Sequence, residues 1–185
     1  MDRPQHYRFH QGDKVLPFSS AEYDARLAKL RTIMAAEGVD ACVFTSMHNI
    51  AYYSGFLYCS FGRPYALVVT PTDSVTMSAG IDAAQPWRRS HGDNITYTDW
   101  QRNNYWRAIV SVTGKGKVIG YEGDHLNLAQ NALLLEFLQP ALTKDIAPAT
   151  MLQRMHKSDA EIALIRAGAQ VADVGGYAIK DVIKV

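Results

Sequence analysis

The chain has 185 residues, of which 48% are hydrophobic and 20% are charged. This composition is typical of a globular protein and excludes a disordered chain, a collagen-like repeat and a disulfide-rich mini-protein. Its 19 Lys and Arg residues nearly balance its 18 Asp and Glu residues, which leaves a formal net charge of +1. Since this balance does not indicate binding to nucleic acid or to an anionic membrane, we expect neither partner.

The cysteines and the N-terminal residues favour a cytoplasmic location. Cys42 and Cys59 lie in apolar stretches, and we predict that they are small buried side chains, not a disulfide framework or a zinc site. The first residues lack the apolar stretch of a signal peptide, and no window approaches the ~18 continuous apolar residues of a membrane span.

The chain begins with an expected leader and a helix. Residues 1–18 show no periodicity, so we predict an extended segment. A capping-box spacing follows, with Ser19 as N-cap and Glu22 three residues later, and Gly38 ends the predicted helix. Apolar residues recur at helical spacing between these signals, and Arg26 lies off that apolar stripe.

Predicted strands and helices alternate through the next hundred residues. Runs rich in β-branched and aromatic residues predict strands, and runs with helical spacing predict helices between them. Their alternation predicts an α/β domain with a mixed sheet sandwiched between helices. The expected strands are 41–45, 65–70, 74–78, 94–97, 117–120 and 144–147, and the expected helices are 49–55 (a short helix or a turn), 83–89, 104–112 and 128–138.

A second capping box, from Ser158 to Glu161, opens a helical pattern that runs to the end of the chain. Gly175 and Gly176 weaken this pattern, but it resumes at once. Because no C-cap glycine, proline or polar tail closes it, we expect more protein to follow. The predicted organisation is an extended leader at 1–18, an α/β domain at 19–150, and a linker with the first helix of a truncated domain at 151–185.

Two polar stretches suggest chemistry but favour structural roles. The run from Gly114 to Gly120 precedes a predicted strand and lacks the spacing of a phosphate-binding loop, so we interpret it as a surface turn. Glu122, Asp124 and His125 lack the further ligands that a metal ion needs, which favours loop and helix-cap roles. The sequence therefore predicts no metal site, and it contains no G-x-S-x-G, H-E-x-x-H or C-x-x-C motif.

An aromatic loop at residues 56–65 surrounds one cation, Arg63. Pro64 biases Arg63 away from helical dihedral angles, and Gly62 permits close backbone approach. A guanidinium held in this way offers two parallel N–H groups to a carboxylate, while Phe61 supplies a dry face beside it. From the residues alone, two interpretations stay open: a contact with a small anion, or an ordinary packed loop.

Two further groups, at residues 85–89 and 98–102, bring tryptophan and arginine together. Such residues are enriched at protein interfaces, and we interpret both groups as an interface or a stacked surface. The sequence does not assign individual roles to Trp87, Arg88, Arg89 and Trp100.

The chain resembles the N-terminal domain of the creatine amidinohydrolase (creatinase) family. The most specific segments are Phe61-Gly62-Arg63-Pro64-Tyr65 and Gln85-Pro86-Trp87-Arg88-Arg89. The linker from Lys157 to Ala169 is similar to the wider creatinase, prolidase and aminopeptidase P family. The resemblance implies a three-layer, ribonuclease H-like α/β/α domain, followed by the long linker helix of a truncated catalytic domain with the pita-bread fold.

The resemblance also implies a function. Members of the family hydrolyse creatine to sarcosine and urea as homodimers, without a metal ion or cofactor, and the catalytic residues would lie beyond Val185. Phe61 and Arg63 would bind the substrate in the active site of the partner subunit, and the 185 residues alone would be inactive. Two alternatives stay open: the N-terminal domain of a metal-dependent X-Pro peptidase, and a non-catalytic dimerisation or ligand-binding module.

Overall fold

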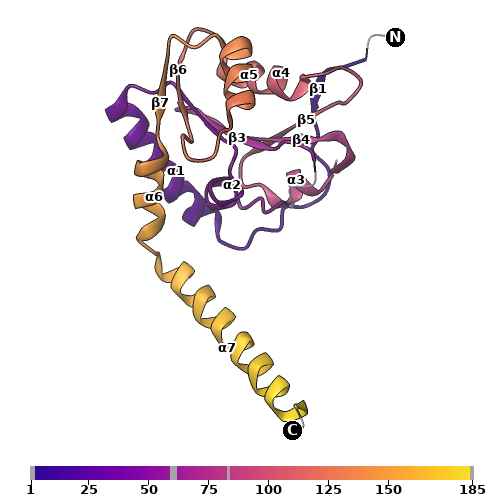
Figure 1. Ribbon diagram of the computed structural model, residues 1–185, viewed down its shortest axis with the longest axis vertical. Helices are drawn as coiled ribbons and strands as arrows, with labels where there is room; N and C mark the ends of the chain where they lie inside the picture. The colour runs from indigo at the N-terminus through magenta and orange to yellow at the C-terminus, as the bar shows by residue number, and fades with distance from the viewer. Residues whose placement is uncertain (1–2, 59–61, 83, 184–185) are drawn as a thin grey trace. The chain divides into compact units, whose positions relative to one another are not determined.

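The computed structural model describes residues 3–58, 62–82 and 84–183. The chain divides into two compact units, Met1–Met151 and Leu152–Val185. The first unit contains a sheet with helices on both of its faces, and the second contains one long helix and the last residues of the helix before it (Figure 1).

Within the described residues, seven strands form one mixed sheet in the order β1-β5-β4-β3-β2-β6-β7. The β2–β3 and β3–β4 pairs are antiparallel, as is the β1–β5 pair at one edge. The β4–β5, β2–β6 and β6–β7 pairs are parallel. The strands are β1 (His6–Arg8), β2 (Ala41–Phe44), β3 (Ala66–Val69), β4 (Ser74–Ala79), β5 (Asp93–Tyr97), β6 (Val118–Tyr121) and β7 (Leu142–Asp145).

The helices of the first unit connect these strands. A short 3-10 turn, Gly80–Asp82, follows β4 and precedes α3. The α-helices are α1 (Ser20–Glu37), α2 (Met47–Ser54), α3 (Ala84–Arg89), α4 (Asn104–Thr113), α5 (Leu128–Leu138) and α6 (Ala147–Met155), the last of which continues into the second unit. The predicted alternation of strands and helices is confirmed.

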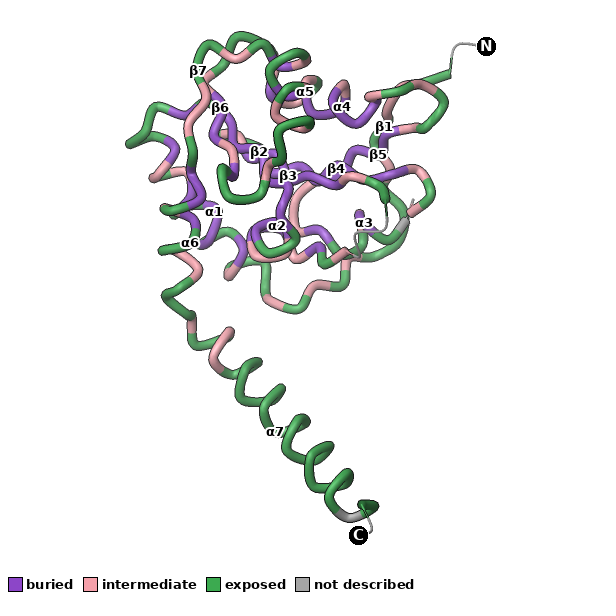
Figure 2. Tube along the Cα trace, viewed as in Figure 1, coloured by how far each residue is buried: buried purple, intermediate pink, exposed green. Residues whose placement is uncertain are grey.

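The central strands β2, β3 and β4 are buried on both faces, which confirms the three-layer α/β/α architecture. Along β2, Ala41 and Val43 pack in one hydrophobic cluster with residues of α4 and α5. Cys42 and Phe44 point the other way and pack with residues of α1 and α2. Alternate side chains of one strand thus fill two cores, as the period of two along a strand requires. Buried residues accordingly concentrate along the central strands (Figure 2).

Cys42 is fully buried, as predicted, and burial raises the pKa of its thiol to about 12. A thiol with such a pKa stays protonated near neutral pH, so Cys42 behaves as a small apolar side chain. Cys59, which we also predicted as buried, lies outside the described residues.

Helix α1 begins and ends where the local signals predicted. The Ser19 side chain accepts a hydrogen bond from the Glu22 N–H, and Gly38 closes the helix with a φ of 62°. Arg26 differs from the prediction, because it is 4% exposed although it lies off the apolar stripe. Its guanidinium lies 4.4 Å from the ring centroids of Phe18 and Tyr52 and bonds the Glu22 carboxylate. Two aromatic faces and a carboxylate therefore replace the water that it loses.

The last strand of the sheet lies two residues earlier than predicted, at Leu142–Asp145 instead of 144–147. Asp145 explains the difference. Its Oδ1 accepts hydrogen bonds from the N–H of Gly123 at 3.0 Å and of Ala147 at 2.9 Å. A side chain that accepts these bonds ends the strand and starts the following helix, so Ala147 becomes part of α6.

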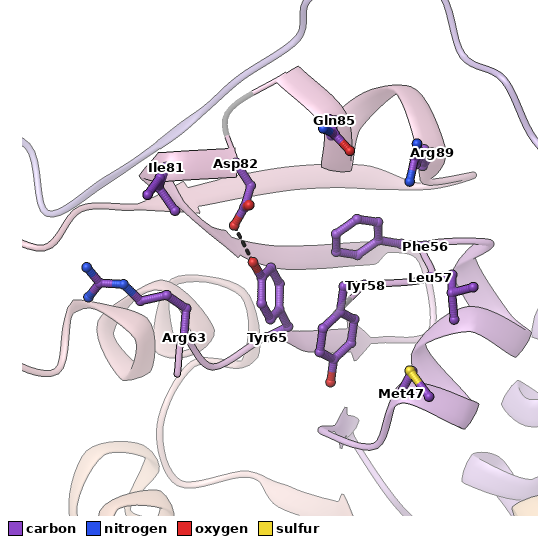
Figure 3. Close-up of a pocket in the computed structure, with 10 residues that line it drawn as sticks. All are labelled: Met47, Phe56, Leu57, Tyr58, Arg63, Tyr65, Ile81, Asp82, Gln85 and Arg89. Carbon is purple, nitrogen blue, oxygen red and sulfur yellow. Dashed lines mark hydrogen bonds between the residues drawn. The ribbon is translucent and has the colours of Figure 1, made fainter. Parts of the chain in front are cut away.

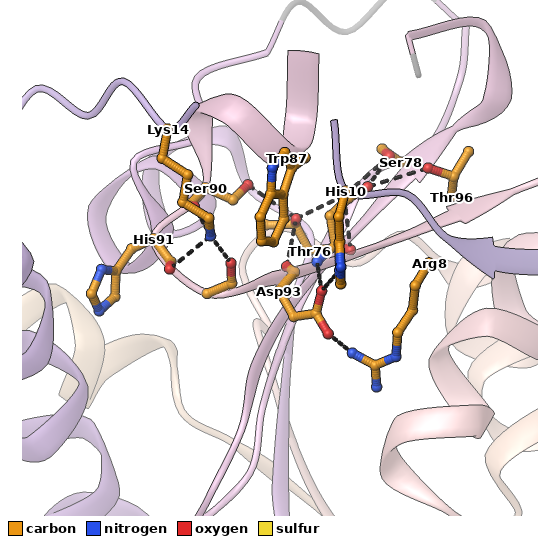
Figure 4. A network of polar contacts seen from close by, with 12 residues as sticks. Arg8, His10, Lys14, Thr76, Ser78, Trp87, Ser90, His91, Asp93 and Thr96 are labelled. Atoms are coloured by element: carbon orange, nitrogen blue, oxygen red, sulfur yellow. Dashed lines mark hydrogen bonds and ion pairs between the residues drawn. The ribbon is translucent and has the colours of Figure 1, made fainter. Parts of the chain in front are cut away.

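The leader is attached to the domain by both tryptophans of the tryptophan–arginine groups. Trp87 Nε1 donates to the Gly12 carbonyl at 3.0 Å, and Trp100 Nε1 donates to the Pro4 carbonyl at 2.7 Å. The Lys14 ammonium donates to the carbonyls of Ser90 and His91, just beyond α3 (Figure 4). The extended leader thus contains strand β1, and the stacked surface predicted for these tryptophans contacts this chain's own N-terminal segment.

The second unit contains α7 (Asp159–Val182), a helix of 24 residues. Its predicted capping box is confirmed, since Ser158 and Glu161 exchange both hydrogen bonds, at 2.9 and 3.2 Å. Gly175 and Gly176 do not interrupt the helix. No helix in the described ranges is long and apolar enough to cross a membrane.

We predict that Gly92→Ala destabilises the protein, because a Cβ at Gly92 would lie 2.0 Å from the Ser74 carbonyl oxygen, where β4 begins beside β5. Backbone must shift to relieve this contact, which costs about 1–3 kcal/mol of unfolding free energy. Thermal unfolding should show a lower midpoint.

Gly168→Ala is the matched control. No heavy atom of the described residues lies within 4 Å of its added Cβ, and alanine is more favourable than glycine inside a helix. An unfolding midpoint for Gly92→Ala equal to that of Gly168→Ala would contradict the close approach of β4 and β5.

Candidate functional site

Arg63 lies in the loop between α2 and β3, and its side chain pairs with Asp99. Arg63 Nη1 donates to Asp99 Oδ1 at 2.9 Å, and the two side chains are 47% and 40% exposed. Phe61, which we predicted beside Arg63 as a substrate contact, lies outside the described residues, so its role stays a prediction.

The backbone turns at Gly62, immediately before Arg63. Gly62 has a φ of +74°, in the left-handed region that glycine adopts without steric cost. Among the described residues, no heavy atom lies within 4 Å of a Cβ added at this position. The close approach that Gly62 would permit to a bound group stays a prediction.

Two buried tyrosines hold the backbone that follows Arg63. The Tyr97 hydroxyl donates to the Pro64 carbonyl at 2.9 Å, and the Tyr105 hydroxyl donates to the Tyr65 carbonyl at 3.1 Å. Burial raises the pKa of Tyr97 and of Tyr105 well above the ordinary value of a tyrosine. Both hydroxyls therefore remain neutral donors near neutral pH, and they fix the loop where it enters β3.

An aromatic pocket of about 700 Å³ adjoins Arg63 (Figure 3). Tyr58 and Tyr65 stack with ring centroids 4.3 Å apart, and Phe56 lies 5.8 Å from each ring. These three rings form an aromatic wall of the pocket. In Figure 3, Arg63 and Met47 lie at opposite ends of this wall. The described lining residues are Met47, Phe56, Leu57, Tyr58, Arg63, Tyr65, Ile81, Asp82, Gln85 and Arg89.

The hydroxyl groups of Tyr58 and Tyr65 in this wall both donate hydrogen bonds. Tyr65 donates to the Asp82 carboxylate, and Tyr58 donates to the Thr45 carbonyl at 2.9 Å. Burial, with the Asp82 hydrogen bond, raises the pKa of Tyr65, and burial raises the pKa of Tyr58 to about 12. At neutral pH the wall is therefore an uncharged aromatic surface with carboxylate and guanidinium groups at its rim.

A second cavity, of about 440 Å³, has a more polar lining. Arg63 lines this cavity as well as the aromatic pocket, together with Asp99 and Arg102. Asn103, the N-cap residue of α4, also lines it and gives the helix no side-chain cap. The Arg63 side chain therefore lies between two cavities, and among the described residues its guanidinium contacts Asp99 through only one of its nitrogens.

The stretch from Glu122 to His125 has a helix-cap role, as we predicted. Glu122 is 1% exposed, and its carboxylate accepts the N–H of Ser46 at 2.8 Å and the Asn49 amide at 2.7 Å, both at the start of α2. His125 bonds the Thr45 hydroxyl at 2.9 Å. No group of three or more His, Cys, Asp or Glu side chains in the described part of the chain is arranged to hold a metal ion.

Sequence reasoning missed the residues that support Arg63. Asp99, Tyr97 and Tyr105 lie 33 to 40 residues from their partners in the loop. The alternation along β5 predicted that Tyr97 is part of a strand, but it gave no signal for the segment that its hydroxyl contacts.

We predict that Glu122→Gln lowers the free energy of unfolding by roughly 1–3 kcal/mol, because an amide NH₂ would face groups that already donate. One such group, the Ser46 N–H, lies 2.8 Å from a carboxylate oxygen. Urea denaturation measures the change. The exposed Glu136→Gln is the control and should match the unsubstituted protein.

Stability should also fall at alkaline pH. Folded Tyr58 keeps its proton to about pH 12, whereas an unfolded tyrosine loses it near pH 10. In this window the unfolded chain binds fewer protons, so the free energy of unfolding falls as pH rises, by about 1.4 kcal/mol per pH unit for one group. Tyr58→Phe should reduce this slope in urea denaturation at pH 9 to 11. An unchanged slope would contradict the burial of Tyr58.

Sequence comparisons show which known proteins the chain resembles. The family model of the creatinase/prolidase N-terminal domain matches residues 26–156. The chain is 48% identical over 178 residues to a creatinase from Bacillus sp. (strain B-0618). The aligned region covers 94% of this chain and 43% of that protein. The chain therefore spans less than half the length of this relative.

Solved structures share the fold at lower identity. The N-terminal domain of an X-Pro dipeptidase from Streptococcus pyogenes is 22% identical, with a TM-score of 0.61, over 69% of this chain and 97% of the other. The prolidase from Pyrococcus horikoshii OT3 is 17% identical, with a TM-score of 0.71, over 86% of this chain and 43% of the other. These likenesses confirm the predicted fold and concern the fold alone.

Proposed function

Because the chain belongs to the creatinase/prolidase N-terminal domain family, we propose that it is the N-terminal part of a creatinase, which hydrolyses creatine to sarcosine and urea. The observation that carries this proposal is the 48% identity to a creatinase over 178 residues. The two fold neighbours described above, a dipeptidase domain and a prolidase, are only 22% and 17% identical.

In this proposal, Arg63 binds the carboxylate of creatine. Creatine has a carboxylate at one end and a guanidinium at the other, so its site needs a cation for the first group and anions for the second. Arg63 is about half exposed, and its contact with Asp99 uses only Nη1 among the described residues, which leaves further N–H groups for a carboxylate. Phe61 would supply an apolar surface next to it.

Arg63 contributes binding and orientation, not proton transfer. Cleavage of the amidine C–N bond requires an activated water and a proton donor for the leaving amine. A guanidinium remains protonated in proteins and does neither. Holding the substrate in a reactive geometry still accelerates the reaction, because it replaces a rare encounter by a fixed arrangement. The catalytic acid, base and guanidinium-binding carboxylates would come from the rest of the protein, and the reaction would need no metal ion or cofactor.

The proposal includes a cytoplasmic homodimer in which Phe61 and Arg63 of one subunit reach the active site of the other. The exposure of Arg63 and its place at the rim of an aromatic pocket of about 700 Å³ are compatible with such a contact. The 185 residues alone would bind creatine weakly and would not hydrolyse it.

A metal-dependent X-Pro peptidase is the second candidate, because the family model that matches the chain covers prolidase as well as creatinase N-terminal domains. Full-length protein should release urea from creatine without added metal and should not cleave an X-Pro dipeptide when Mn²⁺ is supplied. The reverse result would favour the peptidase. Calorimetric titration of the 185 residues with creatine tests the remaining alternative, since a non-catalytic binding module would bind creatine tightly without the rest of the protein.

We predict that Arg63→Ala in the full-length protein raises KM for creatine about 10- to 100-fold, because a charge-assisted hydrogen-bond pair is lost. The circular dichroism spectrum should stay unchanged, because the Arg63 side chain is 47% exposed. Lys29→Ala is the control and should leave KM unchanged, since Lys29 is an exposed cation on α1 that lines neither cavity. Equal KM values for Arg63→Ala and the unsubstituted enzyme would remove Arg63 from the site.

A further inference from the structure

We infer that Asp99 is a positioning residue for Arg63: it holds one edge of the guanidinium so that the other edge is presented to the carboxylate of the substrate. This inference rests on the proposed function. It concerns a residue that would not touch the substrate and would act through the Arg63 side chain, which it contacts at 2.9 Å.

Asp99 stands on a fixed support. It follows Thr98, which comes directly after β5, and β5 lies inside the sheet between β1 and β4. The N–H of Thr98 donates to the Gln5 carbonyl at 2.9 Å, and the Thr98 carbonyl accepts from the Asn104 side chain at 3.0 Å. The leader holds this backbone from one side and α4 holds it from the other, so the Asp99 carboxylate starts from a defined position.

The same strand end also fixes the backbone of its partner. Tyr97, two residues before Asp99, donates its hydroxyl to the Pro64 carbonyl at 2.9 Å. One short segment therefore contacts both the main chain after Arg63 and the guanidinium at the tip of its side chain. These two contacts fix both ends of a long side chain that otherwise has several rotatable bonds.

The contact leaves the guanidinium able to bind a second carboxylate. Nη1 is the only nitrogen of Arg63 with a hydrogen bond to the described residues. A guanidinium has five N–H groups in a planar fork, so an edge with two parallel donors stays free for a carboxylate. Because Asp99 already limits the rotamers of Arg63, less conformational freedom is lost when the substrate binds.

Half-exposed ion pairs add little to protein stability, since water and salt screen them and side-chain entropy opposes them. With 47% and 40% of the two side chains exposed, the Arg63–Asp99 pair belongs to this class. Removing Asp99 should therefore change substrate binding more than folding. A purely structural role would give the opposite result.

A double-mutant cycle in the full-length enzyme tests the inference. Asp99→Ala should raise KM for creatine about 3- to 10-fold with kcat changed less than about 2-fold, and it should leave KM unchanged when Arg63 is already alanine. Asp99→Asn, which keeps an oxygen that accepts from Nη1, should restore most of the lost affinity. If Asp99→Ala does not fold, Asp99→Ser takes its place in the cycle. The serine hydroxyl is too short to reach Arg63, so this variant should show the same rise in KM of about 3- to 10-fold.

Asp24→Ala is the matched control, because the exposed Asp24 carboxylate also contacts a side chain of another segment, His91, at 2.7 Å. It should leave KM unchanged. The outcomes separate the inference from the function on which it rests. If the enzyme does not hydrolyse creatine, or if Arg63→Ala leaves its KM unchanged, both the inference and the proposed role of Arg63 are wrong.

Suppose that Arg63→Ala raises KM. If Asp99→Ala then leaves KM unchanged, or raises KM equally with Arg63 present and with Arg63 replaced by alanine, the positioning role is wrong and the proposed function stands. An Asp99→Asn variant as impaired as Asp99→Ala also counts against positioning by this hydrogen bond.

Discussion

The burial of β2 on both faces is the constraint on which the rest of the first unit depends. Ala41 and Val43 belong to the cluster that contains α4 and α5, and Cys42 and Phe44 belong to the cluster that contains α1 and α2. A strand that supplies both cores cannot shift by one residue without exchanging every side chain between them. Its register is therefore fixed, and so is the point where the chain leaves the sheet for α2.

From that point the chain leads to the candidate site through contacts between distant segments. Glu122, just after β6, binds the first turn of α2, and the loop after α2 carries Arg63. Tyr97 and Tyr105 then hold the same loop from β5 and α4. Several neighbouring elements of the sheet thus support a loop that has no regular secondary structure, as is common where a rigid scaffold presents a binding residue.

Local features of the structure were predictable from the sequence, whereas the site required the fold. The caps of α1 and α7 join atoms three residues apart, so Ser19 and Ser158 marked these helices directly. Asp145 shifted the last strand because its side chain competes with the strand for backbone N–H groups, a choice that depends on tertiary neighbours. Arg63 drew notice through its aromatic surroundings, but its pairing with Asp99, 36 residues away, depends on which strand end meets which loop.

The leader has a consequence for how the protein should be handled. Strand β1 covers the outer side of β5 by pairing His6–Arg8 with residues 95–97. If a protease removed this short segment, the backbone amides and carbonyls along β5 would face solvent as an open edge. Such edges recruit strands from other molecules, so trimming the first dozen residues would invite self-association and precipitation.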